Sequence, residues 1–199
     1  ANDKFWDDGK KSAQGHAKQV KKNRELNSRC ELYQNSKELI IASMQKNWLV
    51  CSFTIPKLVH TMIFSRSQTG DGYGVHWDAP YMTKGRCDLA FTIFLEDPNS
   101  YEGGELFMAS QPQQRKIKLK AGQAIFYPCN VLHQVLEVTK GERLVCVGWI
   151  HSNISNHEHR TNLFNIESNF KMYVKDKGRT VHSDNIFQAI CNLQRSLGN

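Results

Sequence analysis

The spacing of apolar side chains changes twice along this chain. Residues 36–46 carry apolar side chains that share one face of an α-helix, and a shorter helix is expected to begin near Ser12. From Trp48 onward, short alternating or continuous apolar runs take over, as is typical of β-strands. Helical spacing returns over residues 162–173 and 184–197. Helices are therefore expected on both sides of a β-rich middle.

The β-rich middle is divided into short strands by turn residues. Residues 49–55 form an apolar run that stops at Pro56, and residues 59–65 form the next run. Further strands are expected at short spacing over residues 73–78, 87–95, 104–108, 115–119, 123–127, 133–138 and 143–150. About eight or nine short strands with regular turns are typical of a β-sandwich or barrel. The pattern therefore predicts a mainly β fold.

The length of the chain is consistent with a single globular domain. Its 199 residues suffice to bury one hydrophobic core, and 40% of them are hydrophobic. We expect this domain to have three parts: an N-terminal helical segment at 1–47 that packs on the core, a β-rich core at 48–152, and a C-terminal helical extension at 153–199.

Two histidines and an aspartate are candidate metal ligands. His76 and Asp78 are two residues apart, so on a strand they point to the same face and can reach one metal ion together. His133, in a later predicted strand, is the natural third ligand. Two histidines and one carboxylate on one side of a metal form the facial triad of non-haem Fe(II) oxygenases. The competing interpretation is a hydrogen-bonded His76–Asp78 pair beside a turn, and spacing alone leaves both open.

A single arginine opens the last predicted strand. Arg143 precedes the apolar run 144–150 and lies 10 residues after His133 (143 − 133). A guanidinium that lines the same cavity would bind a carboxylate through two parallel hydrogen bonds. The usual co-substrate of such iron sites, 2-oxoglutarate, carries a carboxylate of this kind at its far end. A non-catalytic, cupin-like metal-binding module does not need this arginine, so Arg143 favours an enzyme over that alternative.

Several motifs, in their order along the chain, resemble those of one enzyme family. They include Asp8-Gly9, Tyr73-Gly74-Val75-His76-Trp77-Asp78, Arg86-Cys87-Asp88-Leu89, Tyr101-Glu102-Gly103-Gly104-Glu105-Leu106 and Lys140-Gly141-Glu142-Arg143. The chain is similar to the PKHD-type Fe(II)/2-oxoglutarate hydroxylases, a bacterial prolyl 4-hydroxylase-like group associated with iron uptake. Positions that depart from the family pattern are Ala90, Cys129, Gln134 and Lys140, none of which is a candidate metal ligand.

The resemblance implies a double-stranded β-helix, or jelly roll, flanked by N-terminal and C-terminal helices. It implies that His76, Asp78 and His133 hold Fe(II), and that 2-oxoglutarate and O2 are co-substrates, with Arg143 paired to the C5 carboxylate of the oxoacid. Thr92 is a weaker candidate for a hydrogen bond to the oxoacid, and ascorbate is a further candidate cofactor. The implied reaction is hydroxylation of an amino acid, a peptide or a small metabolite, with release of succinate and CO2.

Three aromatic residues are candidate substrate contacts. Tyr73 does not share strand parity with His76, yet it lies at the expected mouth of the site. Tyr127 and Trp149 would form walls of the pocket. Each of the three would serve equally well as an ordinary core residue, and the sequence leaves both roles open.

Net charge leaves more than one class of partner open. The net charge of +7 favours anionic partners, so an oxygenase that modifies nucleic acid is an alternative with the same metal chemistry. The basic segment at 10–24 lacks interleaved aromatic residues for base stacking, and a solvated basic surface is the simpler interpretation. A homo-oligomer formed through the apolar stripe at 186–193 is a further alternative.

The expected location follows from signals that the sequence lacks. No apolar run approaches the ~18 residues of a membrane span, so we expect no membrane partner. The N-terminus is charged from Asp3 onward and lacks the pattern of a signal peptide. The six cysteines show no Cys-x-x-Cys spacing, and several lie in apolar runs where cysteine acts as a small hydrophobe. We therefore expect a cytoplasmic protein with reduced thiols.

Overall fold

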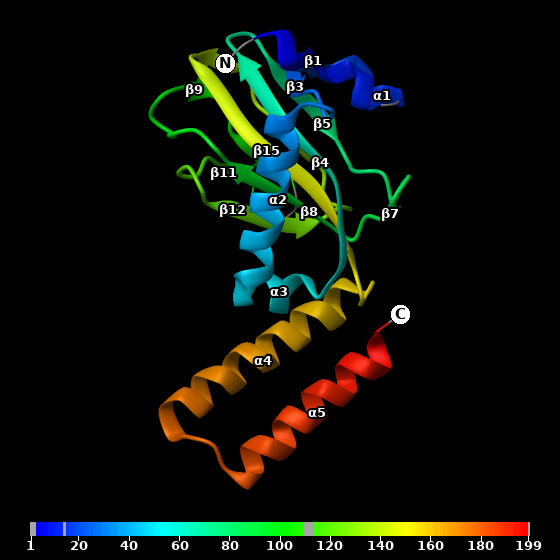
Figure 1. Ribbon diagram of the computed structural model, residues 1–199, viewed down its shortest axis with the longest axis vertical. Coiled ribbons are helices and arrows are strands. Elements are labelled where there is room, and N and C mark those ends of the chain that lie inside the picture. Colours follow the sequence, from blue (N-terminus) through cyan, green and yellow to red (C-terminus); the bar gives the residue numbers. More distant parts are fainter. Residues whose placement is uncertain (1–2, 14, 110–113, 199) are drawn as a thin grey trace.

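The computed structural model describes residues 3–13, 15–109 and 114–198, and two antiparallel sheets form its centre (Figure 1). The larger sheet contains, in spatial order, β1 (Trp6–Asp8), β3 (Arg24–Leu26), β4 (Pro56–Gln68), β15 (Glu142–Ser152), β8 (Leu89–Phe94) and β12 (Ala124–Pro128). The smaller sheet contains β11 (Arg115–Ile117), β10 (Leu106–Met108), β13 (His133–Val135), β5 (Gly72–His76) and β2 (Lys21–Lys22). Two-stranded ribbons join β14 (Val138–Lys140) to β9 (Glu102–Gly103) and β6 (Tyr81–Met82) to β7 (Gly85–Arg86). This arrangement is the expected mainly β jelly roll.

Helices precede and follow the sheets. The described α-helices are α1 (Gly15–Val20), α2 (Glu31–Lys46), α3 (Trp48–Thr54), α4 (His157–Lys177) and α5 (Val181–Leu197), and two short 3-10 helices, η1 (Asp3–Phe5) and η2 (Gly9–Ser12), lie near the N-terminus. Helix α2 runs across the larger sheet (Figure 1), where the Tyr33 hydroxyl donates to the carbonyl of Met62 at 2.7 Å. The Tyr33 ring also meets Phe64 edge-on, with centroids 5.5 Å apart. These contacts bury the outer face of the sheet and leave its inner face to the site.

The apolar run at 49–55 is helical, so the strand predicted there is wrong. Asn47 caps α3, since its side-chain oxygen accepts from the Val50 amide at 3.3 Å. Ile55 ends the helix in the left-handed region, with φ of 42°. A short continuous apolar run fits a buried strand and a buried helix equally well, and here the asparagine cap decides between them. Pro56 then opens β4 and does not end a strand.

The segment before α2 contributes strands as well as helices. Strands β1 and β3 extend the larger sheet, and β2 pairs with β5 in the smaller one. Helix α1 begins at Gly15, after Ser12 and not at it, because Ser12 ends η2 and its hydroxyl donates to Glu25 at 2.8 Å. Residues 3–13 and 15–26 therefore cover one end of the sandwich.

The two C-terminal helices form a hairpin at one end of the molecule (Figure 1). Both extend beyond the predicted limits, and Thr180 begins α5 with a reciprocal capping box to Ser183. Phe164 joins α4 to α3, since its ring stacks near Trp48 and meets Phe53 edge-on with centroids 5.4 Å apart. The division of the chain at residues 47 and 152 stays a prediction. Within the described residues, no helix is long and apolar enough to span a membrane, and all six cysteines are free thiols.

Candidate metal centre

His76 and His133 face each other across two paired strands. Strand β5 ends at His76, β13 begins at His133, and the two are direct partners in the antiparallel register. Cross-strand partners share one face of a sheet, and the two imidazole centroids lie 4.3 Å apart. Asp78 follows two residues after the end of β5, in a loop and not on the strand predicted over 73–78. Ligand atoms of the three residues lie within 4.8 Å of one another.

Each imidazole is oriented by a backbone carbonyl. Nδ1 of His76 lies 2.7 Å from the Gly74 oxygen, and Nδ1 of His133 lies 2.9 Å from the Val131 oxygen. A carbonyl oxygen only accepts, so both Nδ1 atoms carry a proton, and Nε2 is the ring nitrogen left to bind a metal ion. Burial, followed by repulsion from His133, lowers the pKa of His76 to about 4, so this ring is neutral at pH 7. A neutral imidazole with a fixed tautomer is the form that binds a metal ion.

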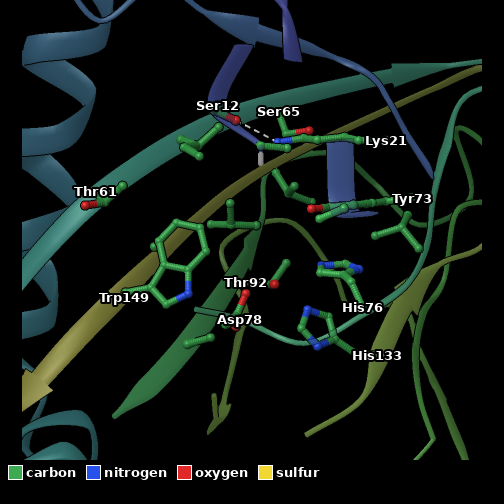
Figure 2. Close-up of a pocket in the computed structure, with 18 of the residues that line it drawn as sticks. Ser12, Lys21, Thr61, Ser65, Tyr73, His76, Asp78, Thr92, His133 and Trp149 are labelled. Atoms are coloured by element: carbon green, nitrogen blue, oxygen red, sulfur yellow. Dashed lines mark hydrogen bonds between the residues drawn. The ribbon is translucent and has the colours of Figure 1, made fainter. Parts of the chain in front are cut away.

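The carboxylate of Asp78 has one enclosed oxygen without a partner. Burial raises the pKa of Asp78, while His133 and Trp149 lower it. Oδ2 of Asp78 makes no hydrogen bond to any described residue. The Trp149 indole nitrogen lies beside this carboxylate (Figure 2), but it is also unpartnered, so the geometry falls short of a hydrogen bond. A buried carboxylate oxygen is costly unless a cation or donor binds it. Two imidazoles and one carboxylate are the donor set of non-haem iron sites, so these residues fit Fe(II).

Arg143 is a buried cation near the start of β15. The side chain is 2% exposed, and no carboxylate in the described part of the chain forms an ion pair with it. Its Nε atom has no hydrogen-bond partner there, and neither has the hydroxyl of Tyr101 beside it. Burial lowers the pKa of Arg143, which nevertheless remains a cation at neutral pH. The Phe94 ring lies 5.7 Å from the guanidinium, and Gly104 makes room for the stem, since a Cβ there would lie 2.9 Å from Arg143 Cδ.

One cavity of about 730 Å³ contains both the metal group and Arg143. It lies between the inner faces of the two sheets, and Figure 2 shows Trp149 and Thr61 on one side with Tyr73, His76 and His133 on the other. The cavity therefore brings three candidate metal ligands and an unpaired cation to one enclosed space, which is large enough for two small molecules.

The remaining residues predicted for the site all line this cavity: Tyr73, Thr92, Tyr127 and Trp149. Tyr73 is adjacent to His76 despite its strand parity, and the two rings stack with centroids 3.6 Å apart. The cause is a β-bulge: His133 pairs with His76 and Val135 pairs with Tyr73, so two residues along β13 correspond to three residues along β5. Thr92 is 1% exposed, and burial raises the pKa of Tyr127, whose hydroxyl lies near Thr92.

A polar group at the opposite end of the cavity is not among the residues predicted from the sequence. Lys21 is 7% exposed, and its ammonium donates to Ser12 Oγ at 2.8 Å and to Glu25 Oε1 at 2.6 Å. The same ammonium lies 5.3 Å from the centroid of the Tyr73 ring, which in turn stacks on His76. The only sequence signal for this ion pair was the i, i+4 spacing of Lys21 and Glu25. Such spacing is common on solvent-exposed helices, but here the two residues lie on two different strands.

Two other charged motifs lie outside the candidate metal centre. Arg86 Nε donates to Asp88 Oδ1 at 2.8 Å, and the second oxygen of Asp88 accepts from the Ser152 amide, as expected of a structural salt bridge. His157 and His159 lie in the first turn of α4, where two residues i and i+2 apart point in different directions. Among the residues that the structure describes, His76, Asp78 and His133 form the one cluster with metal-ligand geometry.

Comparison with known proteins finds close relatives over the full length. A family profile described as the 2OG-Fe(II) oxygenase superfamily matches residues 62–151. A PKHD-type hydroxylase of Prochlorococcus marinus strain MIT 9313 is 45% identical over 198 residues, which is 100% of this chain and 90% of the relative. Another PKHD-type hydroxylase, from strain MIT 9303, is 45% identical over 193 residues, 97% of this chain and 87% of the relative.

Solved structures with the same fold are more distant in sequence. A prolyl-4-hydroxylase from Pseudomonas putida superposes with a TM-score of 0.52 at 18% identity, over 70% of this chain and 77% of the other. A Trichoplax adhaerens prolyl hydroxylase, in complex with a peptide fragment of the hypoxia inducible factor oxygen degradation domain, gives a TM-score of 0.53 at 13% identity, over 80% and 74% of the chains. These structures support the fold. The full-length relatives show the family: the chain belongs to the PKHD-type hydroxylases of the 2OG-Fe(II) oxygenase superfamily, and it is a 2-oxoglutarate-dependent oxygenase.

Proposed function

We propose that this enzyme hydroxylates a small molecule or peptide, using Fe(II) held by His76, Asp78 and His133 and 2-oxoglutarate held by Arg143. Bound Fe(II) would supply oxygen activation, in which O2 and the oxoacid convert a substrate C–H bond to C–OH and release succinate and CO2. The observation that carries this proposal is the unpaired, buried guanidinium of Arg143 in the same cavity as the candidate metal group.

Arg143 has the properties of a carboxylate-binding residue. An isolated buried charge costs several kcal/mol or more, so a guanidinium without an anion is retained where a ligand supplies that anion. Its planar donors suit the C5 carboxylate of 2-oxoglutarate, which they would bind through two parallel hydrogen bonds. A metal-binding module without turnover has no need of this group, and its presence supports co-substrate binding.

Three neighbouring side chains would complete the pocket for the oxoacid. The Thr92 hydroxyl and the Tyr127 hydroxyl, which stays protonated because burial raises its pKa, would donate hydrogen bonds to oxygen atoms of the oxoacid. The Trp149 indole N–H lies beside Asp78 and would hold the carboxylate in one orientation. The apolar walls exclude water from the reacting atoms.

The direct test is turnover of 2-oxoglutarate by the purified protein. With Fe(II), O2 and a substrate mixture of free amino acids and peptides, we expect succinate, and omission of Fe(II) should abolish it. Ascorbate should prolong turnover by keeping the metal reduced, without being consumed in proportion to succinate. Arg143→Met should raise the 2-oxoglutarate concentration needed for half-maximal rate by about 100-fold, which corresponds to about 2.7 kcal/mol. Lys140→Met, at an exposed cation on the neighbouring β14, is the matched control and should leave this value unchanged.

A further inference from the structure

We propose that Ser12, Lys21 and Glu25 form the substrate-recognition subsite of the cavity, and that this subsite binds the ammonium and carboxylate of a free α-amino acid. The inference rests on the proposed function, since it assigns the substrate class of the same cavity. Figure 2 shows Ser12 and Lys21 at the opposite end of the drawn residues from Asp78 and His133, and all of these residues line the one cavity.

The subsite contains an enclosed ion pair with unused bonding capacity. Side chains of Lys21 and Glu25 are 8% and 13% exposed, and their charged atoms lie 2.6 Å apart. An ammonium has three N–H donors, of which Ser12 Oγ and Glu25 Oε1 accept two. Within the described residues, Glu25 accepts hydrogen bonds from Lys21 and from Ser12 on Oε1, and Oε2 stays available for a ligand. The cavity end thus offers one cationic donor beside one anionic acceptor.

Stability alone is a poor explanation for this pair. A buried ion pair is often no more stabilising than apolar residues of the same volume, because both charges lose their hydration. Lys21 lies on β2 of the smaller sheet and Glu25 on β3 of the larger one, so the pair links two sheets that are already built from backbone pairing. A role in binding a ligand would explain why this charged pair lies at the wall of a cavity.

Strand register places Glu25 in a row of side chains between the row of Arg143 and the row of Thr92. Glu25 pairs with Ser65, which pairs with Val145, and these three form one inward-facing row across the larger sheet. The next inward row contains Ile63, Val147 and Thr92. On the smaller sheet, the Lys21 ammonium lies 5.3 Å from the centroid of the Tyr73 ring, which lies 3.6 Å from the centroid of the His76 ring. The ammonium is therefore no farther from the His76 ring than the sum of these two distances, a span that a short aliphatic chain covers.

The wall between the two ends contains apolar side chains beside Ser65, whose hydroxyl already accepts a hydrogen bond from Asn23 at 2.6 Å. Ile63, Val145 and Val147 line the cavity there, so the substrate has an aliphatic part between its polar head and the carbon that reacts. A purely anionic or cationic head would compete with one member of the Lys21–Glu25 pair and leave a buried charge in excess. A zwitterionic head supplies an ammonium for Glu25 and a carboxylate for Lys21, and keeps the site neutral. A free aliphatic α-amino acid has these properties, whereas an internal peptide residue has neither charge.

Binding of free amino acids can be measured without turnover. The full-length protein is loaded with Zn(II), which takes the same nitrogen and oxygen ligands and has no redox chemistry, and with 2-oxoglutarate. Ligand-observed NMR saturation transfer is then recorded for the free L-α-amino acids and for their N-acetyl amide derivatives. We expect aliphatic free amino acids to bind, and the N-acetyl amides to bind at least 10-fold more weakly.

The decisive variant is Lys21→Met with Glu25→Leu, which removes both charges together and leaves no unpaired charge to unfold the protein. We expect this double variant to keep its melting temperature and to lose amino-acid binding at least 10-fold. Lys22→Met is the matched control, because Lys22 is the next residue of β2 and its side chain is 67% exposed. Binding in this control should be unchanged.

Three results would overturn the subsite assignment: no free amino acid binds, N-acetyl amides or blocked peptides bind as tightly as free amino acids, or the double variant binds as the wild type does. A lower melting temperature with unchanged binding would show that the ion pair only stabilises the N-terminal segment. Failure of the proposed function looks different, because amino acids would bind to the Zn(II)-loaded protein while the Fe(II)-loaded protein formed no succinate.

Discussion

The imidazole of His133 lies directly opposite that of His76 across two antiparallel strands, with ring centroids 4.3 Å apart. Each ring donates its Nδ1 proton to a backbone carbonyl two residues earlier in the chain. The backbone itself therefore selects the tautomer that leaves Nε2 free, so the site is prepared for a metal ion before the ion binds.

Replacing His76 or His133 by alanine should remove metal binding. Removal of a group that only orients a metal ligand lowers metal affinity by about 10–100-fold. Removal of one of the three ligands themselves should therefore lower metal affinity by more than about 100-fold. Calorimetric titration with Fe(II) under anaerobic conditions measures the dissociation constant. His182→Ala, on the exposed first turn of α5, provides the control. Unchanged iron affinity in His76→Ala would contradict the ligand assignment.

The ring of Tyr73 should matter more than its hydroxyl. The ring stacks on His76 at a centroid distance of 3.6 Å and fixes the plane of the imidazole. Tyr73→Phe keeps this contact and should leave metal affinity within a factor of about 2, whereas Tyr73→Ala should lower it by about 10-fold, as expected of a group that orients a ligand. The same calorimetric titration distinguishes the two variants, and equal affinities would show that the stack has no role in positioning.

Asp78→Asn should separate metal binding from stability. The metal-free wild type contains a carboxylate oxygen enclosed without a partner, and the amide removes that charge. We expect the melting temperature of the metal-free variant to equal or exceed that of the wild type. Addition of Fe(II) or Zn(II) should raise the melting temperature of the wild type, because a metal ion that binds only to the folded state stabilises that state. The same addition should not raise the melting temperature of the variant. A metal-induced rise of equal size in both proteins would exclude Asp78 as a ligand.

Buried thiols should make the protein less stable in alkali. Burial raises the pKa of Cys87 to about 11 and that of Cys146 to about 12, above the ordinary value of about 8.5. Between these values the unfolded chain releases the thiol protons and the folded chain retains them, so the free energy of unfolding falls as pH rises. Denaturant unfolding between pH 8 and pH 11 should show this fall, and Cys146→Ala should make it shallower.

The same shifts predict which cysteines react with alkylating agents. At pH 8 the thiols of Cys87 and Cys146 stay protonated and enclosed in the folded protein, so iodoacetamide should modify the partly exposed Cys30 and Cys191 first. Peptide mapping by mass spectrometry gives the order of modification. Modification of Cys146 at the rate of Cys191 in folded protein would show that the interior is more open than described here.

Sequence patterns predicted a mainly β fold with flanking helices and singled out His76, Asp78 and His133 as candidate ligands, whereas the jelly roll followed from the family resemblance. The period of two over the middle of the chain predicts the strands, and parity on one strand brings His76 and Asp78 together, although Asp78 proves to lie in the loop just beyond β5. The position of His133 opposite His76 depends on how β13 pairs with β5. The hydrophobic pattern predicts the strands but does not specify the register of their pairing. Arg143 was recognisable because it begins an apolar strand, an unusual place for a charge.

Features that depend on irregular backbone or on long-range packing were not predictable. Helix α3 replaces a predicted strand because one asparagine cap outweighs an ambiguous apolar run. Tyr73 joins His76 only through a bulge, which breaks the parity rule. The Lys21–Glu25 pair lies in the cavity because β2 and β3 add to different sheets, and no local pattern specifies that.

The most direct test of the account is an anaerobic titration of the Fe(II)-loaded protein with 2-oxoglutarate, monitored through the visible charge-transfer band of the chelate. The account predicts a saturable band in the wild type, a midpoint shifted about 100-fold to higher concentration in Arg143→Met, and no shift in Lys140→Met. Iron binding without a band, or the same midpoint in wild type and Arg143→Met, would contradict the claim that the metal group and Arg143 form one co-substrate site.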